Sequence, residues 1–297
     1  MTEDHRKIVL YLAGGTMSGV FGAGVVCALE KRNFYPKIQA VFAGSAGAMN
    51  AAYFLAGQAR FGVPVYTKYM LKHFIYPGKI PLGILKLAWR RYVKPNSKQP
   101  VAVDIDYIMQ VVAHKVPLNS QAVMARKIPF FVKVLNIKTL RVEYLKPNAK
   151  NLLTILKAAI SIVPYYPFAH KVGRRQYIDG TIQNPIGIQE IVKRFPRQKI
   201  VVVMNETGQR GFRHYLKNFV EGSVSKIFLK ELFQIYLARE ELLREDLRFI
   251  RKHPKILIIH PHKLNPTRPR TTNLKKLLTT LDMGRQSAKK IINFANQ

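Results

Sequence analysis

Short apolar runs alternate with segments of helical periodicity along most of the chain. Apolar runs rich in β-branched and aromatic residues predict buried strands at residues 7–13, 38–42, 128–134, 140–145, 199–203 and 255–260. Helical spacing of apolar positions predicts helices at residues 20–30, 48–57, 150–162, 186–194, 228–250 and 274–294. The polar residues 206–223 predict a loop. Because strands and helices alternate, we expect a largely parallel sheet, with an antiparallel hairpin at residues 128–145.

Residues 38–57 stand out because a strand, a tight turn and a helix follow one another there. The turn is Ala43-Gly44-Ser45-Ala46-Gly47. A serine between small residues at such a turn is typical of a nucleophile elbow, where the bend exposes the hydroxyl and the helix N-terminus faces a developing anion. The alternatives are a buried Gly/Ala-rich helix and a membrane span, but the segment would barely cross a bilayer. We therefore expect Ser45 at an elbow, with Gly44 and Gly47 allowing the bend.

A glycine-rich loop follows the first predicted strand. Its sequence is Gly14-Gly15-Thr16-Met17-Ser18-Gly19. A loop of this kind before a helix forms an anion cradle, because unpaired N–H groups converge on one place. A dinucleotide site is disfavoured, since Thr16 stands where the fingerprint requires its second glycine and no acidic residue follows at the required distance. An oxyanion hole beside Ser45 suits the loop better, and its candidate residues are Gly14, Gly15, Thr16 and Gly19.

The third candidate feature is a turn at Asp179. A predicted strand leads to Asp179 and Gly180, and Pro185 follows at a position favoured in the first turn of a helix. Asp-Gly pairs usually form ordinary turns. Few carboxylates occur between residues 31 and 189, however, so Asp179 is a candidate partner of Ser45. The surrounding excess of cations leads us to expect a lowered pKa for Asp179.

Composition limits the class of protein. With 297 residues and 48% hydrophobic residues, the chain can form one large α/β domain or two small ones. The single cysteine, Cys27, excludes an internal disulfide framework and favours a cytoplasmic location. The first residues imitate a signal peptide, but the acidic Glu3 and Asp4 disfavour that interpretation.

The net charge of +33 predicts an anionic partner. An anionic membrane surface is the first candidate and nucleic acid the second. Residues 61–100 interleave basic and aromatic side chains without an acidic residue, which suits either a membrane-contact region or a basic helical cap over the active site. Residues 251–297, a predicted strand and helical tail, contain eleven basic residues against one aspartate and are a second candidate for anion contact.

Taken together, the three motifs make the chain resemble the patatin-like phospholipase family from residue 7 to residue 294. That family carries a Gly-Gly-Gly-x-Arg-Gly loop, a Gly-x-Ser-x-Gly elbow and an Asp-Gly-Gly or Asp-Gly-Ala turn. The corresponding segments here are residues 14–19, 43–47 and 179–181, in the same order and spacing. Each segment departs at one or two positions, notably at Thr16, Ser18 and Ala43.

The resemblance implies a single patatin-like domain over residues 1–297, with a three-layer α/β/α fold and a mostly parallel central sheet. It also implies a lipid acyl hydrolase of phospholipase A or lysophospholipase type, in which Ser45 attacks the ester and Asp179 acts as the base. Phospholipids or other lipid esters would be the substrates, and the protein would be cytoplasmic and peripherally bound to membranes. No cofactor and no metal ion are expected.

Two other hypotheses stay open. The first is an α/β-hydrolase whose Ser45 and Asp179 work with a histidine, for which His214, His253 and His260 are the candidates. The second is a catalytically weak or inactive protein of the same fold that binds an anionic membrane or nucleic acid. Turnover of an ester by the native chain, and its loss on substitution of Ser45, separates the second hypothesis from an enzyme.

Overall fold

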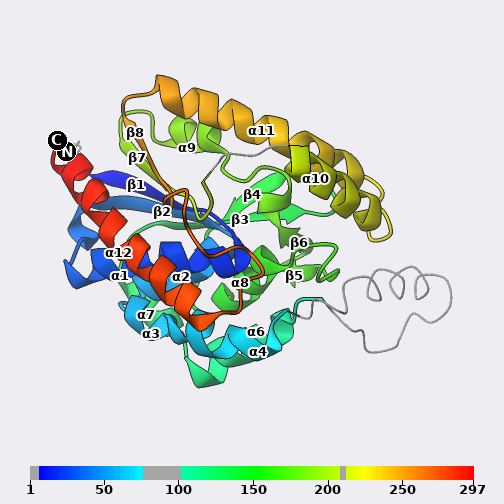
Figure 1. The fold of residues 1–297 in the computed structure, drawn as a ribbon, viewed down its shortest axis with the longest axis horizontal. Coiled ribbons are helices and arrows are strands. Elements are labelled where there is room, and N and C mark those ends of the chain that lie inside the picture. The colour runs from blue at the N-terminus through cyan, green and yellow to red at the C-terminus, as the bar shows by residue number, and fades with distance from the viewer. Residues whose placement is uncertain (1–6, 76–101, 208–211) are drawn as a thin grey trace.

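The computed structural model describes residues 7–75, 102–207 and 212–297 (Figure 1). Its strands are β1 Ile8–Leu12, β2 Ile38–Gly44, β3 Phe130–Asn136, β4 Val142–Leu145, β5 His170–Val172, β6 Arg175–Asp179, β7 Lys199–Val203 and β8 Ile256–Ile259. Its α-helices are α1 Val20–Lys31, α2 Ala46–Leu55, α3 Ala59–Gly62, α4 Met70–His73, α6 Ile105–Gln110, α7 Ser120–Ala125, α8 Leu152–Ile160, α9 Ile188–Arg194, α10 Phe212–Ser225, α11 Leu232–Lys252 and α12 Leu274–Asn296.

The strands form one mixed sheet of eight strands within the described ranges. Five of them, in the order β3-β2-β1-β7-β8, are parallel to their neighbours. The remaining strands extend the β3 side antiparallel, with β4 and β6 on β3 and β5 on β6. The predicted largely parallel sheet and the predicted hairpin, now β3 and β4, are confirmed.

Helices cover both faces of this sheet, so the fold has three layers (Figure 1). Apolar side chains on one face of β1 and β2 pack with those of α1, α2, α8 and α12 in the largest core cluster. The opposite face packs against α9 and α11, and Val9, Phe42 and Leu243 belong to that second cluster. Because β1 is buried on both faces, neither of its sides contacts water, which explains why it consists of apolar residues.

The helical tail is an integral part of one layer, because α12 packs closely on α1. Glycines allow this approach: a Cβ at Gly24 would lie 2.0 Å from the carbonyl oxygen of Leu281, and one at Gly284 would lie 2.1 Å from that of Phe21. Basic residues of α12 therefore extend from a helix whose other side is buried. Its role in anion contact stays a prediction.

The loop predicted at residues 206–223 is wrong over most of its length, because residues 212–225 form α10. Its apolar residues Tyr215, Leu216, Phe219 and Val220 recur at helical spacing, a local signal that the prediction overlooked. Further contacts come from distant parts of the chain. Asn218 donates to Glu240 of α11 at 3.0 Å, and Glu221 accepts from the hydroxyl of Tyr165 at 2.5 Å.

The helix predicted to begin at Pro185 begins three residues later. The carbonyl oxygen of Pro185 accepts a hydrogen bond from the hydroxyl of Tyr11 at 2.6 Å. The chain then turns at Gly187, with φ 73°, before α9 starts at Ile188. The hydrogen bond holds Pro185 against the sheet and delays the helix.

The basic and aromatic region at residues 61–100 is described only up to residue 75, and the rest of the predicted cap or membrane-contact region lies outside the described residues. Within the described part, Tyr66, Met70 and Phe74 are buried and face a cavity next to α2. These aromatic and apolar side chains therefore pack inward, as expected for a helical cap. Contact of the region with a membrane stays a prediction.

Candidate active site

Ser45 occupies a strained turn between β2 and α2. Its backbone has φ 51° and ψ −133°, a combination that residues other than glycine rarely adopt. Its neighbours must be small, because a Cβ at Gly44 would lie 2.5 Å from Thr181 Cγ2 and one at Gly47 would lie 2.2 Å from the carbonyl oxygen of Leu12. Ser45 also directly precedes α2 and so lies at the positive end of that helix. This geometry is that of a nucleophile elbow.

The glycine-rich loop lies directly against Ser45. A Cβ at Gly14 would lie 2.7 Å from Ser45 Cβ and 3.3 Å from Ser45 Oγ. The loop then turns through positive φ at Gly15 and at Thr16, with values of 149° and 51°. Among the described residues, none accepts a hydrogen bond from the amide N–H of Gly15 or Thr16. Free amide donors beside a nucleophile are what an oxyanion hole requires.

Gly19, the last glycine of the loop, has a packing position instead. A Cβ there would lie 2.6 Å from the hydroxyl oxygen of Tyr66. Its carbonyl oxygen accepts a hydrogen bond from Asn50 Nδ2 at 2.8 Å. Gly19 lines neither of the cavities that contain Ser45. The structure therefore brings Gly14, Gly15 and Thr16 next to Ser45, whereas Gly19 packs against Tyr66 and Asn50.

Asp179 lies at the end of β6 and is fully buried. The turn after it is tight, since a Cβ at Gly180 would lie 2.8 Å from backbone atoms of Val134. One carboxylate oxygen, Oδ1, accepts hydrogen bonds from the amide and the hydroxyl of Thr181, both at 2.8 Å. The other, Oδ2, has no partner of hydrogen-bond geometry in the described part of the chain. The Ser45 hydroxyl is nevertheless close enough to lower the pKa of Asp179, so Oδ2 is left to the serine.

Burial raises the pKa of Asp179 above its ordinary value, because the charged carboxylate loses its hydration inside the protein. Hydrogen bonds from Ser45 and Thr181 and the charge of Arg239 oppose the shift without reversing it. The lowered pKa expected from the sequence is therefore wrong. Most of the net charge acts from a distance through screening solvent, whereas desolvation acts on the carboxylate itself.

A buried lysine supports the segment that follows Asp179. Lys133 of β3 is only 1% exposed, and its Nζ donates to the carbonyl oxygens of Asn184 and Ile186 at 2.6 and 2.9 Å. Burial lowers the pKa of Lys133 to about 7, although nearby carboxylates act in the opposite direction. Asp246 of α11 holds the same segment by accepting from the amide of Gly187 at 2.7 Å. The turn is thus fixed from two sides.

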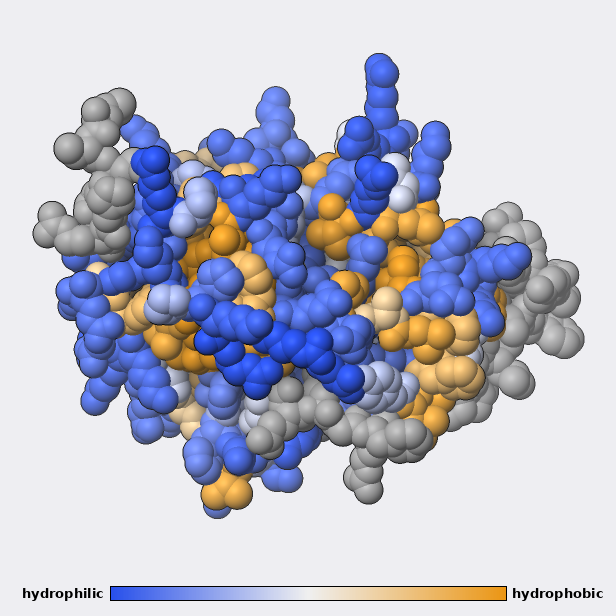
Figure 2. All heavy atoms as spheres, turned by 90° about the horizontal axis from the view of Figure 1, so that it is seen from above, coloured by the Kyte–Doolittle hydropathy of each residue, from blue (hydrophilic) through white to orange (hydrophobic). Residues whose placement is uncertain are grey.

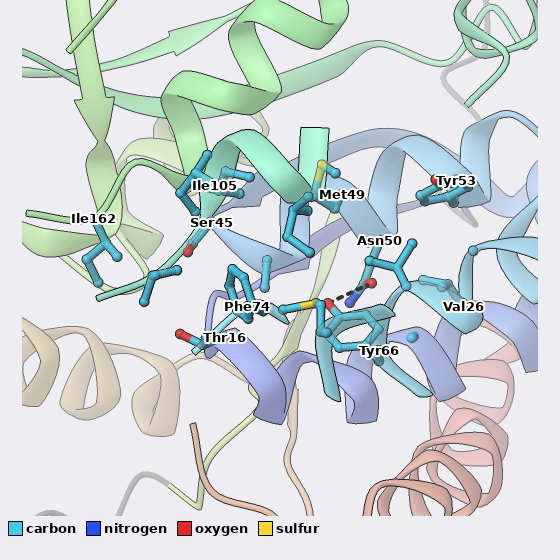
Figure 3. A pocket seen from close by; sticks show the side chains of 18 of the residues that line it. Thr16, Val26, Ser45, Met49, Asn50, Tyr53, Tyr66, Phe74, Ile105 and Ile162 are labelled. Carbon is cyan, nitrogen blue, oxygen red and sulfur yellow. Dashed lines mark hydrogen bonds between the residues drawn. The ribbon is translucent and has the colours of Figure 1, made fainter. Parts of the chain in front are cut away.

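An apolar cavity of about 680 Å³, counting its open part, leads away from Ser45. Ser45 and Thr16 lie near one end and Tyr53 and Val26 near the other (Figure 3). Between them the wall is formed mostly by apolar side chains of α2, α4, α6 and α8, including Met49, Met70, Phe74, Ile105, Ile108 and Ile160.

A second cavity, of about 1000 Å³, meets the first at Ser45 and Thr16. Its wall is far more polar and includes the glycines of the loop and Thr181. Its charged residues come from separate elements and are Glu206, Lys217, Glu221, Arg239 and Arg270. Ser45 therefore lies between the apolar cavity and a second cavity that contains cationic side chains.

The structure places no histidine beside Ser45 within the described ranges. Neither cavity that contains Ser45 is lined by one of them. His253 bonds to the carbonyl oxygen of Phe249 at 2.7 Å, His260 bonds to that of Pro261, and His214 lines a neighbouring cavity. The hypothesis of a histidine-assisted hydrolase gains no support from this arrangement.

Asn205 is a site residue that the sequence did not reveal. It follows β7, which is parallel to β1, so it lies at the same edge of the sheet as the glycine-rich loop. Its Nδ2 donates to the carbonyl oxygens of Ala13 and Gly14 at 2.6 and 3.0 Å, and its Oδ1 accepts from the amide of Gly22 at 2.9 Å. An asparagine two residues after a buried strand was the available signal, since sites gather at the carboxyl ends of parallel strands.

The described residues contain neither a metal-ligand cluster nor a membrane-spanning helix. No group of three or more histidine, cysteine, aspartate or glutamate side chains is arranged to hold a metal ion in the part that the structure describes. None of the described helices is both long and apolar enough to cross a membrane.

Several known proteins are similar to this chain in sequence or in structure. The uncharacterized protein YjjU of Escherichia coli (strain K12) is 24% identical over 264 residues, which is 86% of this chain and 69% of that protein. The crystal structure of VipD from Legionella pneumophila matches with 11% identity and a TM-score of 0.46, covering 97% of this chain and 67% of its own. Human GIVD cytosolic phospholipase A2 matches with 10% identity and a TM-score of 0.49, covering 100% and 61%.

A family model described as patatin-like phospholipase matches residues 10–192, which is more than half of the chain. The match includes the glycine-rich loop, the elbow at Ser45 and the turn at Asp179. The arrangement of these three segments around one point agrees with that match, and the chain belongs to the patatin-like phospholipase family.

Proposed function

We propose that the protein hydrolyses carboxylic esters of membrane lipids, with Ser45 as nucleophile and Asp179 as general base. Membership of the patatin-like phospholipase family supports lipid hydrolysis as such. The observation that carries the assignment of residues is the junction at Ser45. There a strained serine, a buried carboxylate with one unpartnered oxygen and a loop with free amides lie at the mouth of an apolar cavity.

The first half of the reaction forms an acyl-enzyme. Ser45 Oγ attacks the carbonyl carbon of the ester while its proton passes to Asp179 Oδ2. The amide groups of Gly15 and Thr16 donate to the oxyanion of the tetrahedral intermediate. When the intermediate collapses, the alcohol leaves with the proton from Asp179, and the acyl group stays on Ser45.

The second half releases the fatty acid. A water molecule gives its proton to Asp179 as it attacks the acyl carbon, and the same amides hold the new oxyanion. Collapse breaks the bond to Ser45 Oγ, which takes the proton back from Asp179. The hydrogen bonds from Thr181 keep Asp179 Oδ1 fixed throughout, so Oδ2 can serve in both halves.

The apolar cavity would hold the acyl chain. Its long axis runs from Ser45 towards Tyr53 and Val26, and its polar side chains are satisfied within the wall, since the Tyr66 hydroxyl donates to Asn50 Oδ1 at 3.2 Å (Figure 3). A wall without free polar groups suits a hydrocarbon chain, because no polar group loses its hydration when the chain enters.

A membrane surface is the partner that the exposed residues favour. Leu216, Phe219 and Val220 of α10 are 54%, 51% and 50% exposed, and Leu237 of α11 is 39% exposed. Figure 2, which shows the α11 side of the molecule, has hydrophobic groups between hydrophilic ones on this face. Lys217, Arg244 and Arg248 are exposed cations of the same two helices. Apolar side chains among cations on one face are typical of a surface that enters the headgroup region of an anionic bilayer.

The experiment is fatty-acid release from vesicles of mixed anionic and zwitterionic phospholipid by the native protein and by Ser45→Ala and Asp179→Asn. We expect release by the native protein only. Covalent labelling by a fluorophosphonate, lost in Ser45→Ala and retained in Ser18→Ala, checks the nucleophile separately. Vesicle binding without release by any of the three proteins contradicts the proposal and favours the alternative of a catalytically inactive membrane-binding protein.

A further inference from the structure

The second cavity lies where the alcohol part of a substrate must go. It shares Ser45, Thr16, Val103 and Ile162 with the apolar cavity, but its wall also carries five charged side chains, which the apolar cavity lacks. An ester whose carbonyl carbon lies at Ser45 and whose acyl chain fills the apolar cavity points its alcohol side into this second space. The side chains of this wall therefore determine which alcohol part of an ester substrate can bind.

Three cations line this wall and come from separate segments of the chain. Lys217 lies on α10, Arg239 on α11, and Arg270 on the segment between β8 and α12. An adjoining cavity shares all three and adds Lys263 and Arg268. Positive groups that meet from separate elements give one region of positive potential next to the nucleophile.

The carboxylates of the wall do not neutralise this region. Five basic residues line the two adjoining cavities, against the two carboxylates Glu206 and Glu221. Glu221 already accepts a hydrogen bond from the Tyr165 hydroxyl at 2.5 Å and lies 3.5 Å from Lys217 Nζ. The net charge of the pocket is therefore positive.

Arg239 indicates where an anion would bind in this cavity. Its Nε is buried and has no hydrogen-bond partner within the ranges that the structure describes. Its charge acts on Asp179, which places it close to the proposed base. A buried guanidinium donor without a partner is costly, and a phosphate oxygen at the mouth of the cavity removes that cost. Guanidinium groups suit phosphate because they donate two parallel hydrogen bonds.

We propose that Arg239, together with Lys217 and Arg270, binds a phosphate group on the alcohol part of the substrate. The inference rests on the proposed function of Ser45. It specifies the substrate as a phospholipid or lysophospholipid whose phosphate is bound in this pocket, in preference to neutral acylglycerols. Free inorganic phosphate has the same binding chemistry, so the test must separate it from a lipid headgroup.

The test compares two substrates with the same acyl chain, 1-acylglycerol 3-phosphate and 1-acylglycerol, presented in the same detergent. The native protein should prefer the phosphate ester. Arg239→Gln should lower kcat/KM for the phosphate ester about 10- to 100-fold relative to the neutral ester, as expected for loss of a charge-assisted hydrogen bond. Arg248→Gln, an exposed residue on the same helix that lines neither cavity at Ser45, is the matched control and should leave the preference intact.

The ratio of kcat/KM for the two substrates distinguishes a loss of phosphate binding from an effect on the proposed base, Asp179. Arg239 also lowers the pKa of Asp179, and a change in the base alters both substrates equally. Arg270→Gln provides a second variant, because Arg270 is not among the groups that act on Asp179. Equal losses for both substrates in both variants, or no preference in the native protein, overturn the proposal.

A binding measurement tests the phosphate site independently of catalysis. Calorimetry with the Ser45→Ala protein should show binding of glycerol 3-phosphate that Arg239→Gln weakens. Inorganic phosphate should inhibit hydrolysis of the phosphate ester competitively. If phosphate binds without competing with the lipid, the pocket is a free-anion site and the proposal is wrong. If glycerol 3-phosphate binds but no ester is cleaved, the proposed function has failed while the anion pocket stands.

Discussion

The side-chain amide of Asn205 donates a hydrogen bond to the carbonyl oxygen of Gly14 at 3.0 Å, and so ties the glycine-rich loop to the end of β7. Gly14 in turn lies against Ser45. Asn205 also bonds to Ala13 and Gly22 on the two sides of the loop. One side chain therefore sets the path of the backbone whose amides would bind the oxyanion.

Replacement of Asn205 should impair catalysis without removing a reacting group. We expect Asn205→Asp to lower kcat about 10- to 100-fold with little change in KM, because small displacements of aligned groups cost rates of this size. The aspartate keeps the acceptor for Gly22 but loses the donor to Ala13 and Gly14. Initial rates on a soluble ester give the split between kcat and KM. An effect on KM alone would show that Asn205 contacts the substrate and does not position the loop.

Thr16 is strained, and relief of this strain should stabilise the protein. A β-branched residue at φ 51° costs about 1–3 kcal/mol, whereas glycine there costs about 0.5–1 kcal/mol in chain entropy. We expect Thr16→Gly to raise the free energy of unfolding by about 1 kcal/mol, measured in urea. Because its amide is kept, ester turnover should persist.

Lys127→Gly is the control for this change. Lys127 has φ 57° but is exposed and lies before β3, at the opposite edge of the sheet from Ser45. It should gain stability without any change in activity. A loss of stability in Thr16→Gly would show that the threonine side chain makes contacts worth more than the backbone strain.

The sequence predicted the parts of the site that depend on neighbours in the chain. The elbow at Ser45 and the loop at Gly14 are defined by small residues next to a buried strand, so a local pattern is sufficient to find them. The sheet could be predicted for the same reason, since β1 and residues 200–203 of β7 are continuous apolar runs.

The parts that depend on distant residues were not predictable in this way. Asn205 and Arg239 reach the site only because β7 and α11 are placed beside it by the fold. The raised pKa of Asp179 follows from complete burial, which a count of nearby charges in the sequence does not report. The helix α10 was missed for another reason: its apolar residues Leu216, Phe219 and Val220 recur at helical spacing, but the mostly polar composition of residues 206–223 predicted a loop.

The burial of Asp179 predicts a conflict between stability and activity. Its pKa is higher in the folded than in the unfolded chain, so the folded protein holds this proton more tightly and loses stability as pH rises above the ordinary pKa of an aspartate. Asp179→Asn removes the buried charge and keeps an oxygen for Thr181. We expect it to unfold at a higher temperature than the native protein at pH 8, with a smaller difference at pH 4.

The same variant should lose about 10²–10⁴ in rate, the usual contribution of a general base. In the native protein the rate should rise with pH as Asp179 deprotonates, with a midpoint above the ordinary aspartate value. Thermal unfolding and initial rates over this pH range test both statements. A gain in melting temperature that is larger at pH 4 than at pH 8 would contradict the raised pKa.

Val26 closes the far end of the apolar cavity and should set the length of the acyl chain (Figure 3). We expect Val26→Phe to reduce turnover of long-chain esters while short-chain esters are cleaved at close to the native rate. Val25→Phe is the control, because Val25 is equally buried on α1 but does not line the cavity. Both changes should destabilise the fold by about 1–3 kcal/mol through overpacking, so only the chain-length profile distinguishes them.

The exposed apolar residues of α10 predict which face meets the membrane. A double variant with Leu216→Ser and Val220→Ser should weaken binding to anionic vesicles about 10-fold, since each side chain would otherwise bury apolar surface among the lipids. Turnover of a soluble ester should not change, because neither residue lines a cavity at Ser45. Leu278→Ser on α12, where the leucine is 43% exposed, tests the basic tail in the same assay. If Leu278→Ser weakens vesicle binding and the α10 double variant does not, the membrane contact is assigned to the tail, since α10 and α12 lie on different sides of the molecule (Figure 1).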